Sequence, residues 1–342
     1  MVDLEKLVRP SILKLKPYSS ARDEYTGGEG IFVDANENPY GSLNRYPDPY
    51  QKELKQKLSE LKDIAPNRIF VGNGSDEVID LAFRIFCSPG IHKALTCSPT
   101  YGMYDVSSTI NDVDLTKVPL QADFQLDIKG LTAYFNDPSF KLLFLCSPNN
   151  PTGNSLRIED IELVLNQFKG IVILDEAYID FSSEQSLIPL VENYNNLIVS
   201  QTFSKAWGLA SARVGIAYSN TEIISLYNKV KPPYNISGIN QKAALNALNK
   251  TNDYKANLES ILEQKKCLKK QLDELEIVKK IYPSDANFFL IEVDNADKRY
   301  NQLSDLKIIV RNRNTQVKNC LRITVGTAEE NNALIEQLKA MK

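Results

Sequence analysis

The stretch KLLFLCSPNNPTG, residues 141–153, joins an uninterrupted apolar run to a turn rich in Pro and Asn. Apolar runs without alternation are typical of strands that are buried on both faces. Residues 170–174 form a second such run, and a helical pattern with Ile161, Val164 and Leu165 on one side lies between the two. Strands alternating with helices predict an α/β fold with a mostly parallel sheet between helices.

The alternation continues outward from this stretch, beginning with a short strand pattern at residues 68–71 and ending near Pro232 and Pro233. Residues before it are irregular and rich in Pro, Tyr and Asn. We therefore expect three parts: an N-terminal arm with part of a small domain (1–45), a large α/β domain (46–240) and a small C-terminal α+β domain (241–342).

The C-terminal part has the pattern of the smaller domain. A long charged amphipathic helix is expected over residues 252–275. The other elements expected there are strands at 288–291, 306–310 and 321–325 and a helix at 328–341.

The composition is that of an ordinary globular protein, with 43% apolar and 24% charged residues. A net charge of −3 offers no basic footprint, so we expect no nucleic-acid partner. No apolar run approaches the ~20 residues of a membrane helix, and the N-terminus MVDLEKLVRP lacks the pattern of a secretory signal. Five scattered cysteines without a C-x-x-C pair indicate reduced thiols and a cytoplasmic protein.

The chain has a single histidine, His92. A multi-histidine zinc site is therefore excluded, and a Ser-His-Asp hydrolase would depend on this one residue. We expect neither, and we expect no metal. If the chain is an enzyme, its acid–base group is a lysine, a tyrosine or a carboxylate.

Polar residues follow several of the expected strands, where ligands bind in open α/β sheets. Gly74, Ser75 and Asp76 open a helix and could receive a phosphate, although an ordinary helix cap is the favoured interpretation of these residues alone. Asp175 could cap a loop or hold a protonated ring nitrogen. Tyr178 could be a core tyrosine or a ligand.

The stretch QTFSKAWGLASARVG, residues 201–215, places Lys205 among apolar neighbours, where desolvation lowers the pKa of an amine. Arg213, with the hydroxyls of Thr202 and Ser204, could bind a phosphate. A helix-start lysine beside an ion-paired arginine is the ordinary interpretation of this stretch alone.

These residues together form an ordered set, and the chain resembles the fold-type-I pyridoxal-phosphate aminotransferases over nearly its whole length. Within them it is similar to the histidinol-phosphate aminotransferase subgroup. The markers of that subgroup are DANENP (34–39), RYPD (45–48), SPNNPTG (147–153) and CLRITVGT (320–327).

The resemblance implies a role for each matching residue. Lys205 would hold pyridoxal 5'-phosphate as a Schiff base and move a proton, while Asp175 would pair with the ring nitrogen. Asn150 and Tyr178 would bind the ring's 3-oxygen. The implied catalytic residues are Lys205, Asp175 and Tyr178. The implied cofactor-binding residues are Gly74, Ser75, Asp76, Tyr101, Asn150, Asp175, Tyr178, Thr202, Ser204, Lys205 and Arg213, with Tyr46 from a neighbouring subunit. The implied substrate-binding residues are Tyr18, Asn150, Arg311 and Arg322.

The resemblance also implies the reaction: an amino group passes between L-histidinol phosphate and 2-oxoglutarate, in two half-reactions through pyridoxamine phosphate, within a homodimer that shares its sites. A threonine-phosphate decarboxylase or an aromatic amino-acid aminotransferase would use the same cofactor residues. A non-catalytic α/β interaction protein, with caps and surface charges at these positions, is the alternative from another class.

The chain departs from the family pattern in two places. Residues 210–213 read ASAR where AGLR is more common, and this leaves Arg213 in place. The segment between Arg311 and Arg322 is short, and Arg313 lies close to Arg311, so either could bind the substrate anion. We favour Arg311 because it ends the expected strand at 306–310.

Overall fold

The apolar runs form a seven-stranded sheet in the computed structural model, which describes residues 2–19, 21, 25 and 30–341. The order along the sheet is β1-β7-β6-β5-β4-β2-β3, and each neighbouring pair from β6 to β3 is parallel. Only β7 runs against its neighbours, β1 and β6. The prediction of a mostly parallel sheet is confirmed. The strands are β1 (Ile69–Asn73), β2 (Lys93–Ser98), β3 (Asp114–Pro119), β4 (Phe140–Cys146), β5 (Ile171–Asp175), β6 (Leu197–Thr202) and β7 (Val214–Tyr218).

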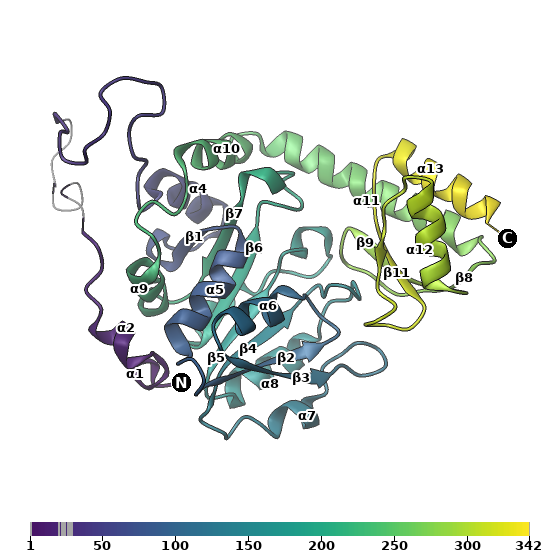
Figure 1. The fold of residues 1–342 in the computed structure, drawn as a ribbon, viewed down its shortest axis with the longest axis horizontal. Helices are drawn as coiled ribbons and strands as arrows, with labels where there is room; N and C mark the ends of the chain where they lie inside the picture. Colours follow the sequence, from purple (N-terminus) through teal and green to yellow (C-terminus); the bar gives the residue numbers. More distant parts are fainter. Residues whose placement is uncertain (1, 20, 22–24, 26–29, 342) are drawn as a thin grey trace.

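Helices cover both faces of this sheet (Figure 1). Phe70, Phe144 and Ile173 belong to one apolar cluster, and Val71, Leu143 and Val172 belong to the cluster on the other face. This division follows from the two-residue period of a strand. The helices are α4 (Lys52–Lys62), α5 (Ser75–Phe86), α6 (Met103–Ile110), α7 (Ile128–Thr132), α8 (Ile158–Gln167), α9 (Thr221–Val230) and α10 (Gly238–Leu248), with short turns η1 (Pro66–Arg68), η2 (Ile179–Phe181), η3 (Ile188–Glu192) and η4 (Ala210–Ala212).

A second, antiparallel sheet of order β10-β11-β9-β8 forms the smaller part of the molecule. The long helix α11 runs from α10 to this sheet (Figure 1). The elements of this part are α11 (Thr251–Asp273), β8 (Val278–Ile281), β9 (Phe288–Val293), α12 (Ala296–Asp305), β10 (Arg311–Asn312), β11 (Cys320–Thr324) and α13 (Ala328–Ala340).

The prediction of a strand at residues 306–310 is wrong. Leu306 caps the end of α12, and Lys307 has a positive φ of 62°, which a continuous strand does not permit. Pairing with β11 begins only at Arg311. Val310 is buried in the core of the smaller part and Ile308 packs against that core, whereas Ile309 is 74% exposed.

The N-terminal segment is less irregular than its composition suggested, since it contains α1 (Leu4–Leu7) and α2 (Pro10–Lys14). Leu4 and Leu7 pack into the cluster that contains Phe70. Residues 1, 20, 22–24 and 26–29 of the expected arm lie outside the described residues. The three domain boundaries stay a prediction.

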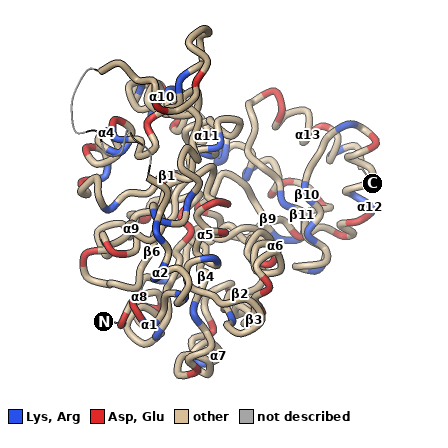
Figure 2. Tube along the Cα trace, turned by 60° about the vertical axis from the view of Figure 1, so that its left-hand side comes forward, with Lys and Arg blue, Asp and Glu red and all other residues tan. Residues whose placement is uncertain are grey.

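Figure 2 shows acidic and basic residues interspersed over both parts of the molecule. Within the described residues, no helix has the length and apolar character needed to cross a membrane. All five cysteines are free thiols, and four of them are buried.

Candidate active site

A cavity lies at the carboxyl edge of the large sheet, where the parallel strands β4, β5 and β6 end. It brings together ten of the residues singled out in the sequence. The lining residues are Ser75, Asp76, Tyr101, Cys146, Asn150, Asp175, Ala177, Tyr178, Thr202, Ser204, Lys205 and Arg213. Segments that are more than 100 residues apart in the chain meet here because parallel strands share one carboxyl edge.

Asp175 is the floor of this cavity. It ends β5, is only 2% exposed, and accepts hydrogen bonds from the Tyr104 hydroxyl (2.8 Å) and the Ala177 amide (3.1 Å). Burial raises the pKa of its carboxyl to about 6, while the Tyr104 bond opposes that rise. The carboxylate is therefore held in place but remains ready to pair with a cation.

Asn150 and Tyr178 form a polar chain along one wall. The Asn150 side-chain amide donates to the Tyr178 hydroxyl at 3.3 Å, and its carbonyl oxygen accepts from Arg322 Nη1 at 2.5 Å. Burial raises the pKa of the Tyr178 hydroxyl. Tyr178 also packs edge-on against Phe288 of β9, with ring centroids 5.2 Å apart, so this wall links the two sheets.

Lys205 follows β6, with its Nζ 5.5 Å from the centroid of the Tyr178 ring. Partial desolvation lowers the pKa of its amine, and the charge of Arg322 lowers it further. Asp175 and Asp76 oppose the shift. The net effect enlarges the fraction of neutral amine, the form that acts as a nucleophile or base.

The start of α5 forms the opposite end of the cavity. Ser75 is the first residue of this 12-residue helix, whose free N–H groups and dipole favour an anion. Arg213 Nη2 lies 3.0 Å from Asp76 Oδ2 and faces the same turn. A Cβ on Gly215 would lie 2.2 Å from the Ser75 nitrogen, so glycine is required for β7 to approach the turn this closely.

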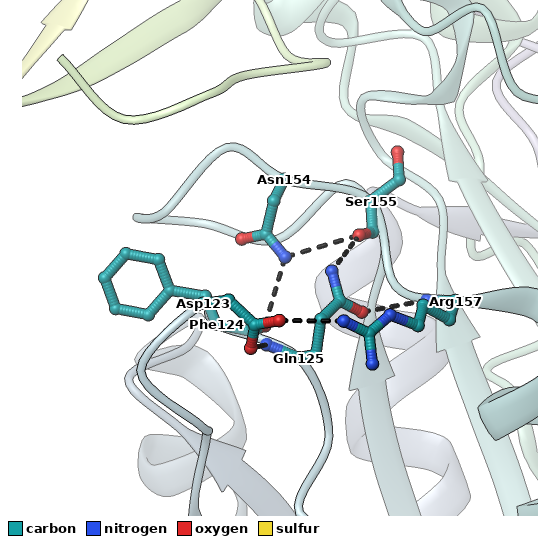
Figure 3. Close-up of polar contacts among 6 residues, drawn as sticks. All are labelled: Asp123, Phe124, Gln125, Asn154, Ser155 and Arg157. Atoms are coloured by element: carbon teal, nitrogen blue, oxygen red, sulfur yellow. Dashed lines mark hydrogen bonds and ion pairs between the residues drawn. The ribbon is translucent and has the colours of Figure 1, made fainter.

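The turn that carries Asn150 is fixed from outside the cavity (Figure 3). Arg157 binds the Asp123 carboxylate at 2.8 Å, and the Asn154 amide donates to the Phe124 carbonyl at 3.0 Å. Gln125 adds a bond to the Ser155 carbonyl at 2.9 Å. These contacts hold the segment that follows the SPNNPTG turn, residues 154–157, against the neighbouring loop at residues 123–125.

Three guanidinium groups come from the smaller sheet. Arg311 lies directly opposite Arg322 in the ladder, and Arg313 follows two residues on. Burial lowers the pKa of Arg313 to about 10, and the charges of Arg322 and Arg311 contribute. Among the described residues, the buried Nε atoms of Arg313 and Arg322 have no hydrogen-bond partner. Such a crowded, partly unpaired set suits an anion with several oxygens.

Tyr18 and Tyr46 do not line the cavity of their own chain. Tyr18 is 68% exposed. Tyr46 is half exposed and stacks on Tyr234, with centroids 4.4 Å apart, and its amide donates to Glu37.

Sequence reasoning missed Tyr104, Cys146 and Phe288. Tyr104 stands three residues after Tyr101, but this spacing gives no indication of its hydrogen bond to Asp175, 71 residues away. Cys146 is the last residue of β4, and the strand-end rule that selected Asp175 applies to it too. Phe288 carried no such signal because its contact with Tyr178 joins separate sheets.

The donor set fits one kind of small molecule. A buried carboxylate suits a protonated ring nitrogen, a helix N-terminus with an arginine suits a phosphate, and a lysine with a lowered pKa suits a carbonyl carbon. The three features line a single cavity.

Comparison with known proteins gives a consistent result. The family model for aminotransferase class I and II matches residues 31–338. A histidinol-phosphate aminotransferase of Christiangramia forsetii is 52% identical, covering 99% of this chain and 98% of that protein. The crystal structure of the histidinol-phosphate aminotransferase from Clostridium acetobutylicum has a TM-score of 0.80 and 24% identity, covering 87% of this chain and 90% of that one. The Sinorhizobium meliloti histidinol-phosphate aminotransferase, solved with pyridoxal-5'-phosphate, has a TM-score of 0.79 and 24% identity, covering 90% of this chain and 89% of that one.

Proposed function

Because this chain belongs to the class I and II aminotransferases and, within them, to the histidinol-phosphate aminotransferase family, we propose that it transfers the amino group of L-histidinol phosphate to 2-oxoglutarate. The observation that carries the proposal is the contact of Arg322 with Asn150, a residue of the cavity that also contains Lys205 and Asp175. An anion-binding group thus stands beside the groups suited to the cofactor.

Pyridoxal 5'-phosphate is the cofactor of this enzyme, and when bound it supplies a carbonyl for the amino group and a ring that spreads negative charge from Cα. We propose that Asp175 holds the ring nitrogen and that Asn150 and Tyr178 bind the 3-oxygen. Tyr101 would lie against the ring. The residues proposed around the phosphate are Gly74, Ser75, Asp76, Thr202, Ser204 and Arg213.

Lys205 would carry the cofactor and then act as the base that moves the proton at the substrate Cα. Its lowered pKa supports this role, since a larger neutral fraction is available at neutral pH. The ionised carboxylate of Asp175 would keep the ring nitrogen protonated. Tyr178 would orient the 3-oxygen while its own hydroxyl, with a raised pKa, stays protonated.

The substrate phosphate would bind Arg322 and a second arginine. The strand pattern favoured Arg311, but Arg311 is exposed, whereas Arg313 is half-buried with a buried, unpaired Nε among the described residues. These features support Arg313 as the second ligand.

Arg313→Ala is therefore expected to raise the KM for histidinol phosphate by roughly thirtyfold, because a hydrogen-bonded charge is lost. Arg311→Ala serves as the matched control, with a change of less than about threefold. Steady-state kinetics of both variants decide the question. A large effect of Arg311→Ala alone would restore Arg311 as the second ligand.

A substrate panel tests the proposed reaction against its neighbours. The protein, loaded with pyridoxal phosphate, is given histidinol phosphate, phosphothreonine or phenylalanine, each with 2-oxoglutarate, and glutamate and CO₂ are measured. We expect glutamate from histidinol phosphate at a kcat/KM at least about a hundredfold above that from phenylalanine. Release of CO₂ from phosphothreonine would indicate a decarboxylase instead. A protein that binds no pyridoxal phosphate would indicate a non-catalytic role.

We also propose a cytoplasmic homodimer in which Tyr46 reaches the partner's cofactor phosphate and Tyr18 covers the substrate. The exposure of both tyrosines outside their own cavity supports this arrangement. Sedimentation of the active protein is expected to give twice the chain mass. Tyr46→Phe should weaken cofactor binding by about tenfold. An active monomer would contradict the shared site.

A further inference from the structure

Tyr104 makes a side-chain hydrogen bond to Asp175, and sequence reasoning assigned no role to this residue. It lies on α6, is fully buried, and donates its hydroxyl to Asp175 Oδ2 at 2.8 Å. The Ala177 amide binds the other carboxylate oxygen at 3.1 Å. One side-chain donor and one backbone donor therefore fix the carboxylate, each through a different oxygen.

The ring of Tyr104 has a second contact of interest. It meets Tyr101 edge-on, with centroids 5.6 Å apart and planes at 88°. On its other side it stacks on Phe144 of β4 at 4.9 Å, and Phe144 stacks on Phe83 of α5 at 5.1 Å. The aromatic stack joins α6 to the sheet, so Tyr104 has little freedom to move.

We propose that Tyr104 is a positioning residue of this site. Its hydroxyl orients the Asp175 carboxylate toward the cofactor ring, and its aromatic ring supports Tyr101 against the face of the cofactor ring. The inference rests on the proposed role of Asp175 as the partner of the ring nitrogen. A single buried side chain then sets two of the contacts that determine where the cofactor ring lies.

The hydroxyl also affects the charge of Asp175. Burial raises the pKa of this carboxyl, and the bond from Tyr104 lowers it. The Ala177 amide and Lys205 also lower this pKa, and Asp76 raises it. The other titratable groups that face it are the Cys146 thiol and the hydroxyls of Tyr101 and Tyr178, all of which burial keeps protonated. Removing the Tyr104 hydroxyl therefore shifts the pKa of Asp175 upward and leaves less carboxylate to pair with a protonated ring nitrogen.

The test measures the affinity of the apoprotein for pyridoxal phosphate between about pH 5 and about pH 8 in the wild type and in Tyr104→Phe, which keeps the ring and removes only the hydroxyl. We expect the dissociation constant at neutral pH to rise about tenfold and the midpoint of its pH dependence to move up by about one unit. Affinity is present above the pKa of Asp175 and is lost below it, so the variant loses affinity at a higher pH than the wild type.

Tyr227→Phe is the matched control. Tyr227 is also fully buried, but its hydroxyl donates to the backbone carbonyl of Val78, at 3.0 Å, and not to Asp175. Both variants lose one buried hydrogen bond, so both should lose similar stability against urea. Only Tyr104→Phe should change the cofactor's dissociation constant and its pH midpoint.

Asp175→Ala, alone and combined with Tyr104→Phe, distinguishes a failure of this inference from a failure of the proposed role of Asp175. If Tyr104 acts through Asp175, its substitution changes the dissociation constant by less than about twofold in the Asp175→Ala background. An equal effect in both backgrounds, or an unchanged midpoint in Tyr104→Phe, overturns the inference while the proposed function stands. Unchanged affinity in Asp175→Ala removes the proposed role of Asp175, and the inference with it.

Discussion

Replacing Lys205 with alanine is expected to lower kcat by about a thousandfold or more while the protein stays folded. Lys205 is the cavity's only amine among the described residues, and its lowered pKa makes it the available base. A positioned general base accelerates proton transfer by about a hundredfold to ten-thousandfold, and the loss of the covalent attachment adds to this. The measurement is the rate of glutamate formation at saturating substrate.

Borohydride reduction of the loaded wild type, followed by peptide mapping, should locate the cofactor on Lys205. Lys242→Ala is the control, because Lys242 is an exposed lysine of α10 that lies outside this cavity. Its activity should match the wild type. Full activity of Lys205→Ala, or cofactor recovered on another lysine, would remove the central residue of the account.

Replacing Asp175 with asparagine is expected to weaken cofactor binding by about a hundredfold and to lower kcat by about a thousandfold. The substitution keeps the shape but removes the charge that stabilises a protonated ring nitrogen. The loss of one partner from a buried charge pair costs about 3 kcal/mol, and each 1.4 kcal/mol is about tenfold. Equilibrium titration with pyridoxal phosphate and steady-state kinetics measure the two effects.

The pH dependence of cofactor affinity should distinguish Asp175→Asn from the wild type more sharply than the affinity at one pH. The pKa of Asp175 is raised to about 6, so the wild-type carboxylate is ionised above that pH and is neutralised below it. Cofactor affinity of the wild type should therefore fall as the pH drops below about 6, and the variant should lack this fall. Glu176→Gln is the control: its buried carboxylate binds Ser186 and Gln201 instead, and the pH dependence should persist. A wild-type profile in Asp175→Asn would contradict the assignment.

Local sequence patterns predicted the large sheet and its edge. The runs at 141–145 and 170–174 are apolar because both faces of a parallel sheet are buried. The sequence therefore predicted that they are strands and where they end. Asp175 stood out because a polar residue directly after such a run lies at the carboxyl edge. Asn150 lies in the turn that follows the other run, and the family resemblance implied its role. Their gathering with Lys205 in one cavity follows from that rule.

Contacts between elements that are distant in the chain could not be predicted from the sequence. The strand expected at 306–310 failed because turn formation after α12 outweighed a short apolar run, as the positive φ of Lys307 shows. The preference for Arg311 over Arg313 depended on that strand. Tyr104 was overlooked because its value depends on Asp175, 71 residues away. Propensity and spacing do not encode such packing.

The most direct test of the account follows the nitrogen itself. L-Histidinol phosphate labelled with ¹⁵N at its α-amino group is incubated with the loaded protein and 2-oxoglutarate, and the products are resolved by mass spectrometry. The proposed transamination predicts that ¹⁵N appears in the amino group of glutamate, one for each substrate consumed, and that Lys205→Ala transfers none. Label recovered as free ammonia, or retained in unreacted substrate while pyridoxal phosphate is bound, would contradict it.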